Sequence, residues 1–182
     1  MLKGKVVTLR PVQEDDLPQL YEHILNIENR GEFYPASIQT LAELRKELNT
    51  TGFWSREFGL LLLIDNKTKN VIGQIVYFTT VRYMDELEIG YILYDTSRRR
   101  SGAMSEALNL LTRYLFDTKP INRIRLCIVT ENKGSRGVAK NGGYIHEGTQ
   151  RGCFFNKGKL HDMELYAIIR SDLAKVKSKK SG

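Results

Sequence analysis

A basic, glycine-containing turn at residues 98–102 combines residue types suited to binding an anion. Three arginines precede a serine and a glycine there, between an expected apolar strand at 88–93 and an expected amphipathic helix at 101–117. The first backbone N–H groups of a helix have no partner within the helix, and the helix dipole adds positive charge at that end. The sequence therefore predicts a phosphate site at the N–H groups of residues 99–105. The alternative is a solvated basic loop before an ordinary helix.

The two cysteines do not suggest a metal centre or a disulfide framework. Cys127 and Cys153 are far apart in the sequence, and neither belongs to a CxxC pair or to a histidine set of zinc spacing. We expect both thiols to be reduced and no metal to be bound. We expect Cys127 to be a core residue, because no neighbour in the sequence would lower the pKa of its thiol.

The composition predicts one folded domain. The chain has 182 residues, of which 41% are hydrophobic and 27% charged, and no apolar run reaches membrane-spanning length. Its start lacks the apolar segment of a signal peptide, so we expect a cytoplasmic protein. The net charge of +7 suits an acidic partner, whether a phosphorylated cofactor, an acidic protein or RNA. We expect the domain to occupy residues 1–170 and the basic residues 171–182 to form a disordered tail.

The first part of the chain predicts a strand and two helices. A strand at 6–9 precedes an acidic cluster at 14–16, which favours the start of a helix. Thr40 and Glu43 form a capping box, which predicts the start of a second, short helix. The core-facing stripe expected on the first helix consists of Leu17, Leu20, Tyr21, Ile24 and Leu25.

The middle of the chain predicts a sheet followed by a helix. Apolar segments at 58–65, 71–79 and 88–93 are separated by polar turns and read as an antiparallel meander. The helix expected at 101–117 would bury Met104, Ala107, Leu108, Leu111 and Leu115.

The last part of the chain makes the fold mixed α/β. A strand at 123–130 follows the helix, and a strand, helix, strand unit of this kind requires a parallel pair. A short helix at 132–141, a strand beginning at 144–147 and a hairpin around 156–159 complete the prediction.

Short motifs occur in a recognisable order along almost the whole chain. They are Leu9-Arg10-Pro11, Asp16-Leu17, Glu88-Ile89-Gly90-Tyr91, Arg99-Arg100-Ser101-Gly102-Ala103-Met104-Ser105, Asn132 with Ser135, Gly143-Tyr144, Glu147-Gly148, Gly158 and His161-Asp162. This order resembles the GCN5-related N-acetyltransferases (GNAT), and within them the bacterial ribosomal-protein N-terminal acetyltransferases of the RimJ/RimL type. Arg99 and Gly102 fit the family's pattern at the turn, whereas Met104 departs from it and resembles the RimL branch.

The resemblance implies a fold and a cofactor. The fold would be a largely antiparallel central sheet with a splayed parallel strand pair, flanked by helices. Acetyl-CoA would bind with its pyrophosphate on the N–H groups of residues 100, 102, 103 and 105 and its pantetheine arm along strand 89–93. The cofactor-binding residues implied in this way are Ile89, Tyr91, Ile92, Leu93, Arg99, Arg100, Ser101, Gly102, Ala103, Met104, Ser105, Asn132 and Ser135.

Acetyl transfer to an amine needs a base for the amine and a proton for the departing thiolate. The resemblance places Ser135 near the thioester as the proton donor, with helix capping as the alternative role. RimL-like enzymes carry an acidic side chain after Glu147-Gly148, but Phe154 stands there in this chain. Glu88 is our candidate base, and the alternatives are Glu86 on the same strand face, His146 and His161.

The acceptor implied by the resemblance is a primary amine at a protein N-terminus, of the ribosomal-protein type. Relatives with this outline also acetylate small amines, so an antibiotic, polyamine or amino sugar is the alternative. A non-catalytic acyl-CoA-binding module is the second. We expect no direct binding to nucleic acid or membrane, and a monomer or homodimer. The aromatic segments 33–35 and 53–54 are candidates either for a substrate cleft or for covering the core.

Overall fold

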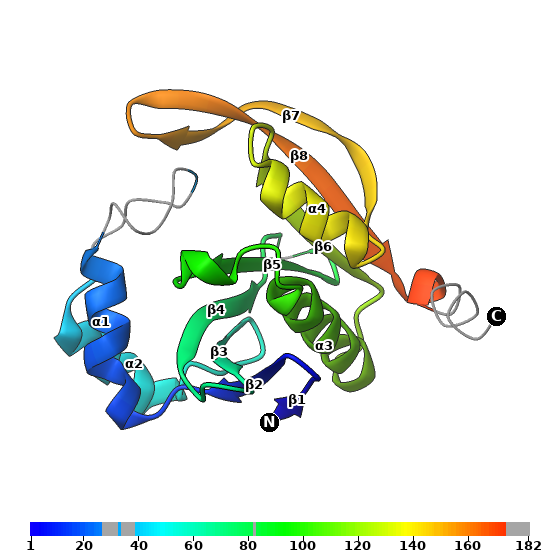
Figure 1. Cartoon of the computed structure of the whole chain (residues 1–182). Coiled ribbons are helices and arrows are strands. Elements are labelled where there is room, and N and C mark those ends of the chain that lie inside the picture. The colour runs from blue at the N-terminus through cyan, green and yellow to red at the C-terminus, as the bar shows by residue number, and fades with distance from the viewer. Residues whose placement is uncertain (27–32, 34–38, 82, 174–182) are drawn as a thin grey trace.

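One eight-stranded sheet, with strand order β1-β2-β3-β4-β5-β6-β8-β7, organises the molecule (Figure 1). The structure, a computed structural model, describes residues 1–26, 33, 39–81 and 83–173. Neighbouring strands are antiparallel, except that β5 and β6 run parallel. The predicted mixed α/β fold is confirmed. The strands are β1 (Leu2–Lys3), β2 (Val7–Pro11), β3 (Phe58–Asp65), β4 (Val71–Phe78), β5 (Glu86–Leu93), β6 (Arg123–Val129), β7 (Ile145–Asn156) and β8 (Lys159–Ile169).

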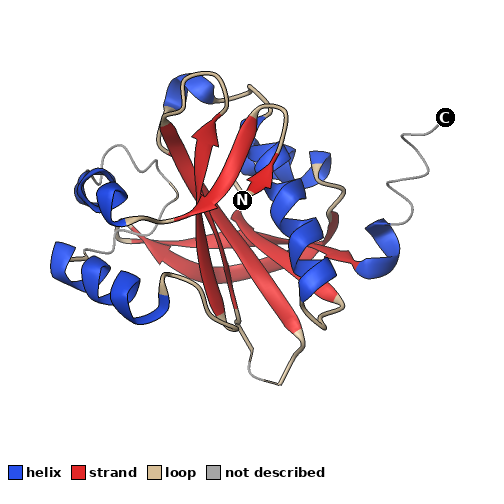
Figure 2. Ribbon diagram, turned by 90° about the horizontal axis from the view of Figure 1, so that it is seen from below, coloured by secondary structure: helices blue, strands red, loops and turns tan. Residues whose placement is uncertain are grey.

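Helices cover both faces of the sheet (Figure 2). On β3, Leu60 and Leu62 pack with the helices of one face, while Leu61 and Leu63 pack with those of the other. This alternation follows from the two-residue period of a strand, and it explains why the segment is apolar without interruption. The helices are α1 (Leu17–Leu25) and α2 (Leu41–Thr51) on the first face, and α3 (Ala103–Thr118) and α4 (Lys133–Asn141) on the second.

The N-terminal helices begin where their capping signals predict. The Thr40 hydroxyl accepts the N–H of Glu43 at 3.2 Å, and the Glu43 carboxylate accepts the N–H of Thr40 at 2.8 Å, so the capping box is confirmed. A 3₁₀ turn, η1 (Glu14–Asp16), leads into α1. The predicted core stripe of α1 is wrong at Leu25, which is 50% exposed. This residue lies about 80° around the helix from Leu17, at the edge of the stripe.

The helix α3 buries every side chain predicted for its core face: Met104, Ala107, Leu108, Leu111 and Leu115. It also holds the start of the chain in place. The Glu106 carboxylate accepts three N–H groups, from Lys5 at 2.7 Å, Val6 at 2.7 Å and Val7 at 2.8 Å. Burial opposes ionisation of Glu106, but the three N–H groups outweigh it and lower the pKa of the carboxyl. A side chain distant in sequence therefore anchors the entry to β2.

The parallel pair of strands is short. Only three residue pairs join β5 to β6, from Glu86 with Arg123 to Glu88 with Arg125. Beyond them β5 continues to pair with β4, and β6 with β8, so the two strands diverge. This is the splayed parallel pair that the sequence resemblance implies.

The C-terminal end of the fold lies a little beyond the expected boundary. Residues 170–173 form a helical turn, and Leu173 packs against the core. The Asp172 carboxylate accepts the N–H of Ile169 at 3.1 Å. The rest of the expected tail, 174–182, lies outside the described residues. Among the helices that the structure describes, none combines the length and the hydropathy needed to span a bilayer.

Candidate active site

The start of α3 presents a group of main-chain N–H donors. Arg100 has φ +64° and the N-cap residue Gly102 has φ +84°, so the chain curls just before the helix. Alternating backbone conformations of this kind turn successive N–H groups toward one concave side. The N–H of Ala103 is directed to the Ser101 hydroxyl at 3.3 Å. Within the described chain, the N–H groups that carry no such bond belong to Arg100, Gly102, Met104 and Ser105.

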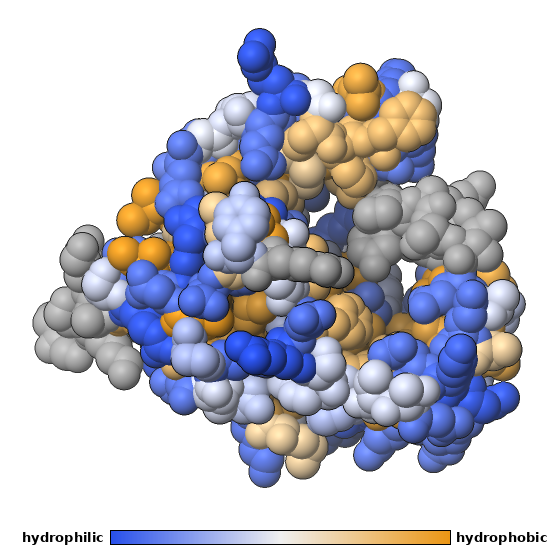
Figure 3. Space-filling model, turned by 180° about the vertical axis from the view of Figure 1, so that it is seen from behind, coloured by the Kyte–Doolittle hydropathy of each residue, from blue (hydrophilic) through white to orange (hydrophobic). Residues whose placement is uncertain are grey.

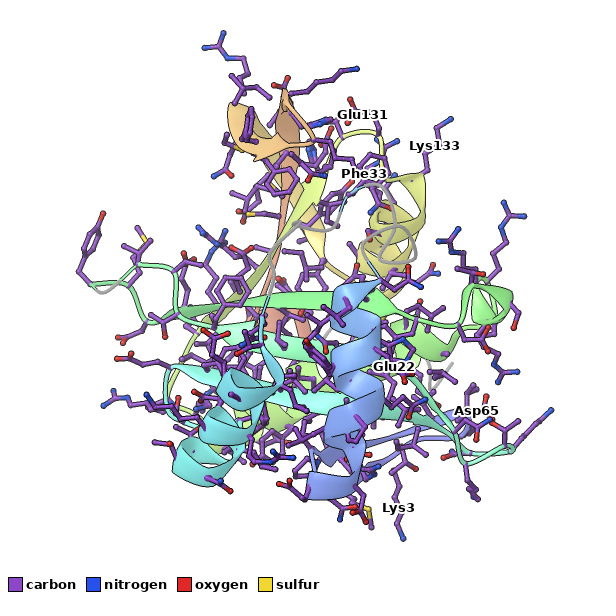
Figure 4. The ribbon with its side chains drawn as sticks, turned by 90° about the vertical axis from the view of Figure 1, so that its left-hand side faces the viewer. Lys3, Glu22, Phe33, Asp65, Glu131 and Lys133 are labelled. Atoms are coloured by element: carbon purple, nitrogen blue, oxygen red, sulfur yellow. The ribbon has the colours of Figure 1, made fainter. Side chains whose placement is uncertain are left out.

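The three arginines of this turn do not share one role. Arg98, in the 3₁₀ turn η2 (Thr96–Arg98), forms an ion pair with the buried carboxylate of Asp65 at the end of β3 (labelled in Figure 4). The N–H of Thr68 lowers the pKa of the Asp65 carboxyl most, and the N–H of Lys67 and the charge of Arg98 act in the same direction. Burial opposes them, and the net shift of the pKa is downward. Arg99 and Arg100 are exposed. Two of the three guanidinium groups are thus placed to face an anion, and the third holds η2 on the β3–β4 turn.

The gap between β5 and β6 exposes the main chain of β5. The N–H of Tyr94 donates to the carbonyl of Ile72 of β4 at 2.9 Å, so the main-chain groups of Tyr94 point toward β4. Main-chain groups alternate between the two sides of a strand, so those of Ile89, Tyr91 and Leu93 face the gap. From behind, the surface is hollowed between the lobe that carries β7 and β8 and the body of the molecule (Figure 3).

Ile92 and Met104 differ from the other candidate cofactor residues. The carbonyl of Ile92 faces β4, because a Cβ added to Gly73 would lie 2.4 Å from it. The side chains of Ile92 and Met104 are buried, at 7% and 8% exposure. Met104 can therefore offer a ligand only its N–H, and Ile92 faces away from the gap.

The N-terminus of α4 lies across the gap from β5. Asn132 is the cap of this helix, since its side-chain oxygen accepts the N–H of Ser135 at 3.0 Å. The Ser135 hydroxyl is thus not the cap, and its residue is half-buried. The Tyr91 hydroxyl donates to the Ser135 carbonyl at 3.3 Å, which joins β5 to α4. Glu131 and Lys133, labelled in Figure 4, mark the start of α4.

Glu88 lies at the point where β5 and β6 diverge, on the sheet face opposite α3. Its side chain is 14% exposed, and its Oε2 accepts Arg125 Nε at 2.9 Å and the Cys127 thiol at 3.5 Å. Burial raises the pKa of the Glu88 carboxyl, while the Arg125 guanidinium and the Cys127 thiol act in the opposite direction. A carboxylate with a raised pKa at such a position can accept a proton from a neighbouring amine.

Glu86 is held more tightly than Glu88. It is 6% exposed and contacts Arg123 Nε at 3.0 Å and Arg125 Nη1 at 3.1 Å. Arg123 also donates to Glu147 at 2.7 Å. Two guanidinium groups bind Glu86, which makes it a structural part of the parallel ladder.

The two candidate histidines have neighbours outside the Glu88 cluster. His146 Nε2 contacts the carboxylate of Glu164 of β8, and His161 lies beside Phe154, with ring centroids 6.3 Å apart. Burial and the adjacent Glu88 raise the pKa of the Cys127 thiol to about 12. Cys127 is therefore a thiol and not a nucleophilic thiolate, as predicted, but it is half-buried beside the gap and not in the core.

Two contacts of this site were absent from the sequence-based set. Arg125 bridges Glu86 and Glu88, and the Tyr91 hydroxyl reaches α4. The sequence did indicate the first contact. Arg123 and Arg125 alternate along β6, and in a parallel pair they fall on the same face as Glu86 and Glu88 of β5. The second contact depends on the angle between the strands, which the sequence does not encode locally.

Comparisons with known proteins identify the family. Residues 7–145 match the acetyltransferase (GNAT) domain family. The chain is 28% identical to the probable N-acetyltransferase YjcK of Bacillus subtilis (strain 168), over 94% of this chain and 98% of the relative. It is 25% identical to the ribosomal-protein-serine acetyltransferase of Escherichia coli (strain K12), over 88% and 91% respectively.

Solved structures share the fold. A RimL ribosomal L7/L12 α-N-protein acetyltransferase in complex with coenzyme A superimposes with TM-score 0.76 at 22% identity, covering 91% of this chain and 95% of that one. A spermidine N-acetyltransferase from Vibrio cholerae, in complex with coenzyme A and spermine, gives TM-score 0.76 at 20% identity, covering 94% and 99%. Together with the family match, the splayed strands and the N–H donors of α3 show that this chain belongs to the GNAT family of acetyl-CoA-dependent N-acetyltransferases.

Proposed function

We propose that the enzyme binds acetyl-CoA in the gap between β5 and β6 and acetylates the amine of a protein N-terminus. The observation that carries this proposal is the location of the donors. The free N–H groups at the start of α3 lie at the end of the same strand, β5, whose main chain pairs with β4 but has no described partner strand on the β6 side from Ile89 onward. A pyrophosphate would bind the N–H groups of Arg100, Gly102 and Ser105, beside the exposed Arg99 side chain. A pantetheine arm would extend a missing strand along Ile89, Tyr91 and Leu93.

Two residues take part in the proposed acetyl transfer, Glu88 as the base and Ser135 as the acid. Glu88 takes a proton from the acceptor's ammonium group, directly or through a water, which leaves a neutral amine to attack the thioester carbonyl. A C–N bond forms and the C–S bond breaks. Ser135 donates a proton to the departing thiolate, directly or by orienting a water. No covalent enzyme intermediate is needed, which agrees with the raised pKa of the Cys127 thiol.

Ser135 is suited to this role by what surrounds it. Asn132 provides the helix cap, so the Ser135 hydroxyl is not used for capping. The contact between the Tyr91 hydroxyl and the Ser135 carbonyl keeps Ser135 at the rim of the gap. The proposed acid and base then lie on α4 and β5, on either side of the gap.

The protein N-terminus is favoured over a polyamine by two observations. The sequence relatives include a ribosomal-protein-serine acetyltransferase, whereas the spermidine enzyme shares only the fold. The buried glutamates at the divergence of the strands are matched by Arg123 and Arg125, so they do not offer a polycation an unpaired acidic surface.

A direct assay of thiol release tests the proposal. The purified enzyme is supplied with acetyl-CoA and with peptides that start with a free amine, the same peptides with a blocked amine, spermidine, or amine-bearing antibiotics. We expect turnover with the free peptides and none with the blocked ones. Turnover confined to polyamines or antibiotics would replace the protein N-terminus with a small amine. Absence of turnover in all arms, despite binding of coenzyme A, would contradict the assigned roles of Glu88 and Ser135.

A further inference from the structure

An apolar cavity lies between α1, α2 and the β3–β4 face of the sheet. It has a volume of about 540 Å³, and its apolar walls include Ile24 of α1, Leu44 of α2, Leu60 of β3, and Val76 and Phe78 of β4. This volume is within the range of about 300–1,000 Å³ typical of small-ligand sites. None of the five residues takes part in the cofactor site or in the proton transfers described above.

The cavity lies on the same sheet face as the candidate base, one strand away. Phe78 of β4 pairs with Glu88 of β5, and Val76 pairs with Gly90. Directly paired residues of antiparallel strands point to the same face, so the Phe78 wall and the Glu88 carboxylate share one side of the sheet. Gly90 separates the Glu88 side chain from that of Ile92, and a Cβ there would lie 3.3 Å from Val76 and 3.7 Å from Phe78. Because Gly90 has no side chain, nothing at this position separates Glu88 from the cavity on this face of the sheet.

The polar groups of the cavity do not match a polycation. Gln74 is hydrogen-bonded to the Tyr94 hydroxyl. Glu47 is the single carboxylate among the described lining residues, and it accepts the Thr51 hydroxyl within its own helix. A triamine would have to place several ammonium groups against aliphatic and aromatic walls, where ions are strongly disfavoured. An uncharged, apolar group would instead remove water from those walls.

We infer that this cavity is a specificity site, which takes an apolar side chain carried close to the reacting amine of the acceptor. The inference rests on the proposed function, since it places the acceptor amine at Glu88. The acceptor is then an N-terminal segment with a residue such as Leu, Met or Phe at its first or second position. Burial of such a side chain corresponds to a preference of about 10- to 100-fold in kcat/KM over glycine.

A peptide series tests the inference. Tetrapeptides that differ only at residue one or residue two, with Gly, Leu, Phe, Glu or Lys, are compared by kcat/KM at saturating acetyl-CoA. We expect Leu or Phe at one of the two positions to exceed Gly, Glu and Lys by about 10- to 100-fold. Equal values for all peptides, or the highest values for Glu or Lys, would overturn the inference.

A variant that fills the cavity tests whether the cavity causes the preference for Leu and Phe peptides. Ile24→Trp places an indole in the cavity and should reduce kcat/KM for the Leu and Phe peptides to the level of the Gly peptide, while the Gly peptide stays within about threefold. Leu25→Trp is the matched control, because Leu25 is the next residue of α1 and is 50% exposed. It should leave the series unchanged. Val76→Phe fills the cavity from the sheet side and repeats the test if Ile24→Trp does not fold. Loss of all activity without loss of coenzyme A binding in both filled variants would contradict a side-chain role.

Small amines separate this inference from the proposed function. Ethylamine, phenethylamine and spermidine are compared in the same assay. If peptides are not substrates but phenethylamine exceeds ethylamine and Ile24→Trp abolishes that difference, the cavity inference holds and the protein N-terminus fails. If spermidine is preferred to phenethylamine, the cavity inference fails.

Discussion

Replacement of Gly102 by aspartate should weaken coenzyme A binding through charge. Gly102 has φ +84°, and no described atom lies within 4 Å of an added Cβ, so the space for a side chain exists. The left-handed backbone costs an L-residue about 1 kcal/mol whatever its charge. A carboxylate at this place would lie beside the free N–H groups of the helix and would compete with the pyrophosphate for them.

The size of the effect follows from Coulomb's law. Two unit charges about 5 Å apart interact by about 1 to 3 kcal/mol, for effective dielectric constants between those of water and of a protein surface. Gly102 is exposed, so the lower value applies to each of two phosphate charges. The sum of about 2 kcal/mol corresponds to a rise of roughly 30-fold in Kd. Gly102→Asn has the same size and backbone cost but no charge, and we expect a rise of only a few-fold.

Isothermal titration calorimetry with two ligands measures this charge repulsion separately from the backbone cost. Coenzyme A should bind Gly102→Asp roughly 30-fold more weakly than wild type, and the gap between the Asp and Asn variants should shrink as salt is added. Acetyl-pantetheine, which lacks the pyrophosphate, should bind the two variants equally. Equal affinities of the Asp and Asn variants for coenzyme A would refute the location of the pyrophosphate at α3.

Four further substitutions test the remaining assignments. Glu88→Gln should lower kcat roughly 100-fold with little change in the Kd of coenzyme A, and it should remove the acidic limb of the pH–rate profile, which the raised pKa of Glu88 places above the usual range for glutamate; an unchanged limb would move the base elsewhere. Ser135→Ala should lower kcat about tenfold without lowering the Tm, whereas Asn132→Ala should lower the Tm because it removes the cap; a fall in Tm alone for Ser135→Ala would leave it only a structural role. Glu106→Gln should destabilise the fold by about 2 kcal/mol at pH 7 in urea unfolding. The pKa of Glu106 is lowered on folding, so its contribution is present above the unfolded pKa of about 4.3 and is lost as the pH falls through the folded pKa; a difference between variant and wild type that does not shrink as the pH falls below about 4.3 would contradict this account.

Local patterns predicted the elements that depend on neighbouring residues. The capping box at Thr40 and the apolar stripe of α3 both act within a few residues, and both are present in the structure. The parallel β5–β6 pair followed from chain connectivity. Leu25 shows the limit of such patterns, because it lies at the edge of the apolar stripe and is the last residue of the helix.

The site was harder to predict where it depends on distant partners. Arg98 belongs to the basic turn in sequence, yet its partner is Asp65 on another strand. The cap of α4 could have been either Asn132 or Ser135, and only the geometry assigns it to Asn132. Within the aromatic segments, Phe53 lies in the wall of the cavity, whereas Trp54 packs against Tyr77 in the core. Phe33 is half-buried in a turn, and residues 34 and 35 lie outside the described part of the chain.

The brevity of the parallel ladder leaves few main-chain links between the two parts of the sheet. Among the described strands, three rungs connect the half-sheet β1–β5 to the half-sheet β6–β8, and Glu86 and Glu88 reach across this seam to the arginines of β6. Arg125 therefore holds the candidate base Glu88 from the opposite side of the seam, so the environment of the Glu88 carboxylate depends on how the two half-sheets are joined.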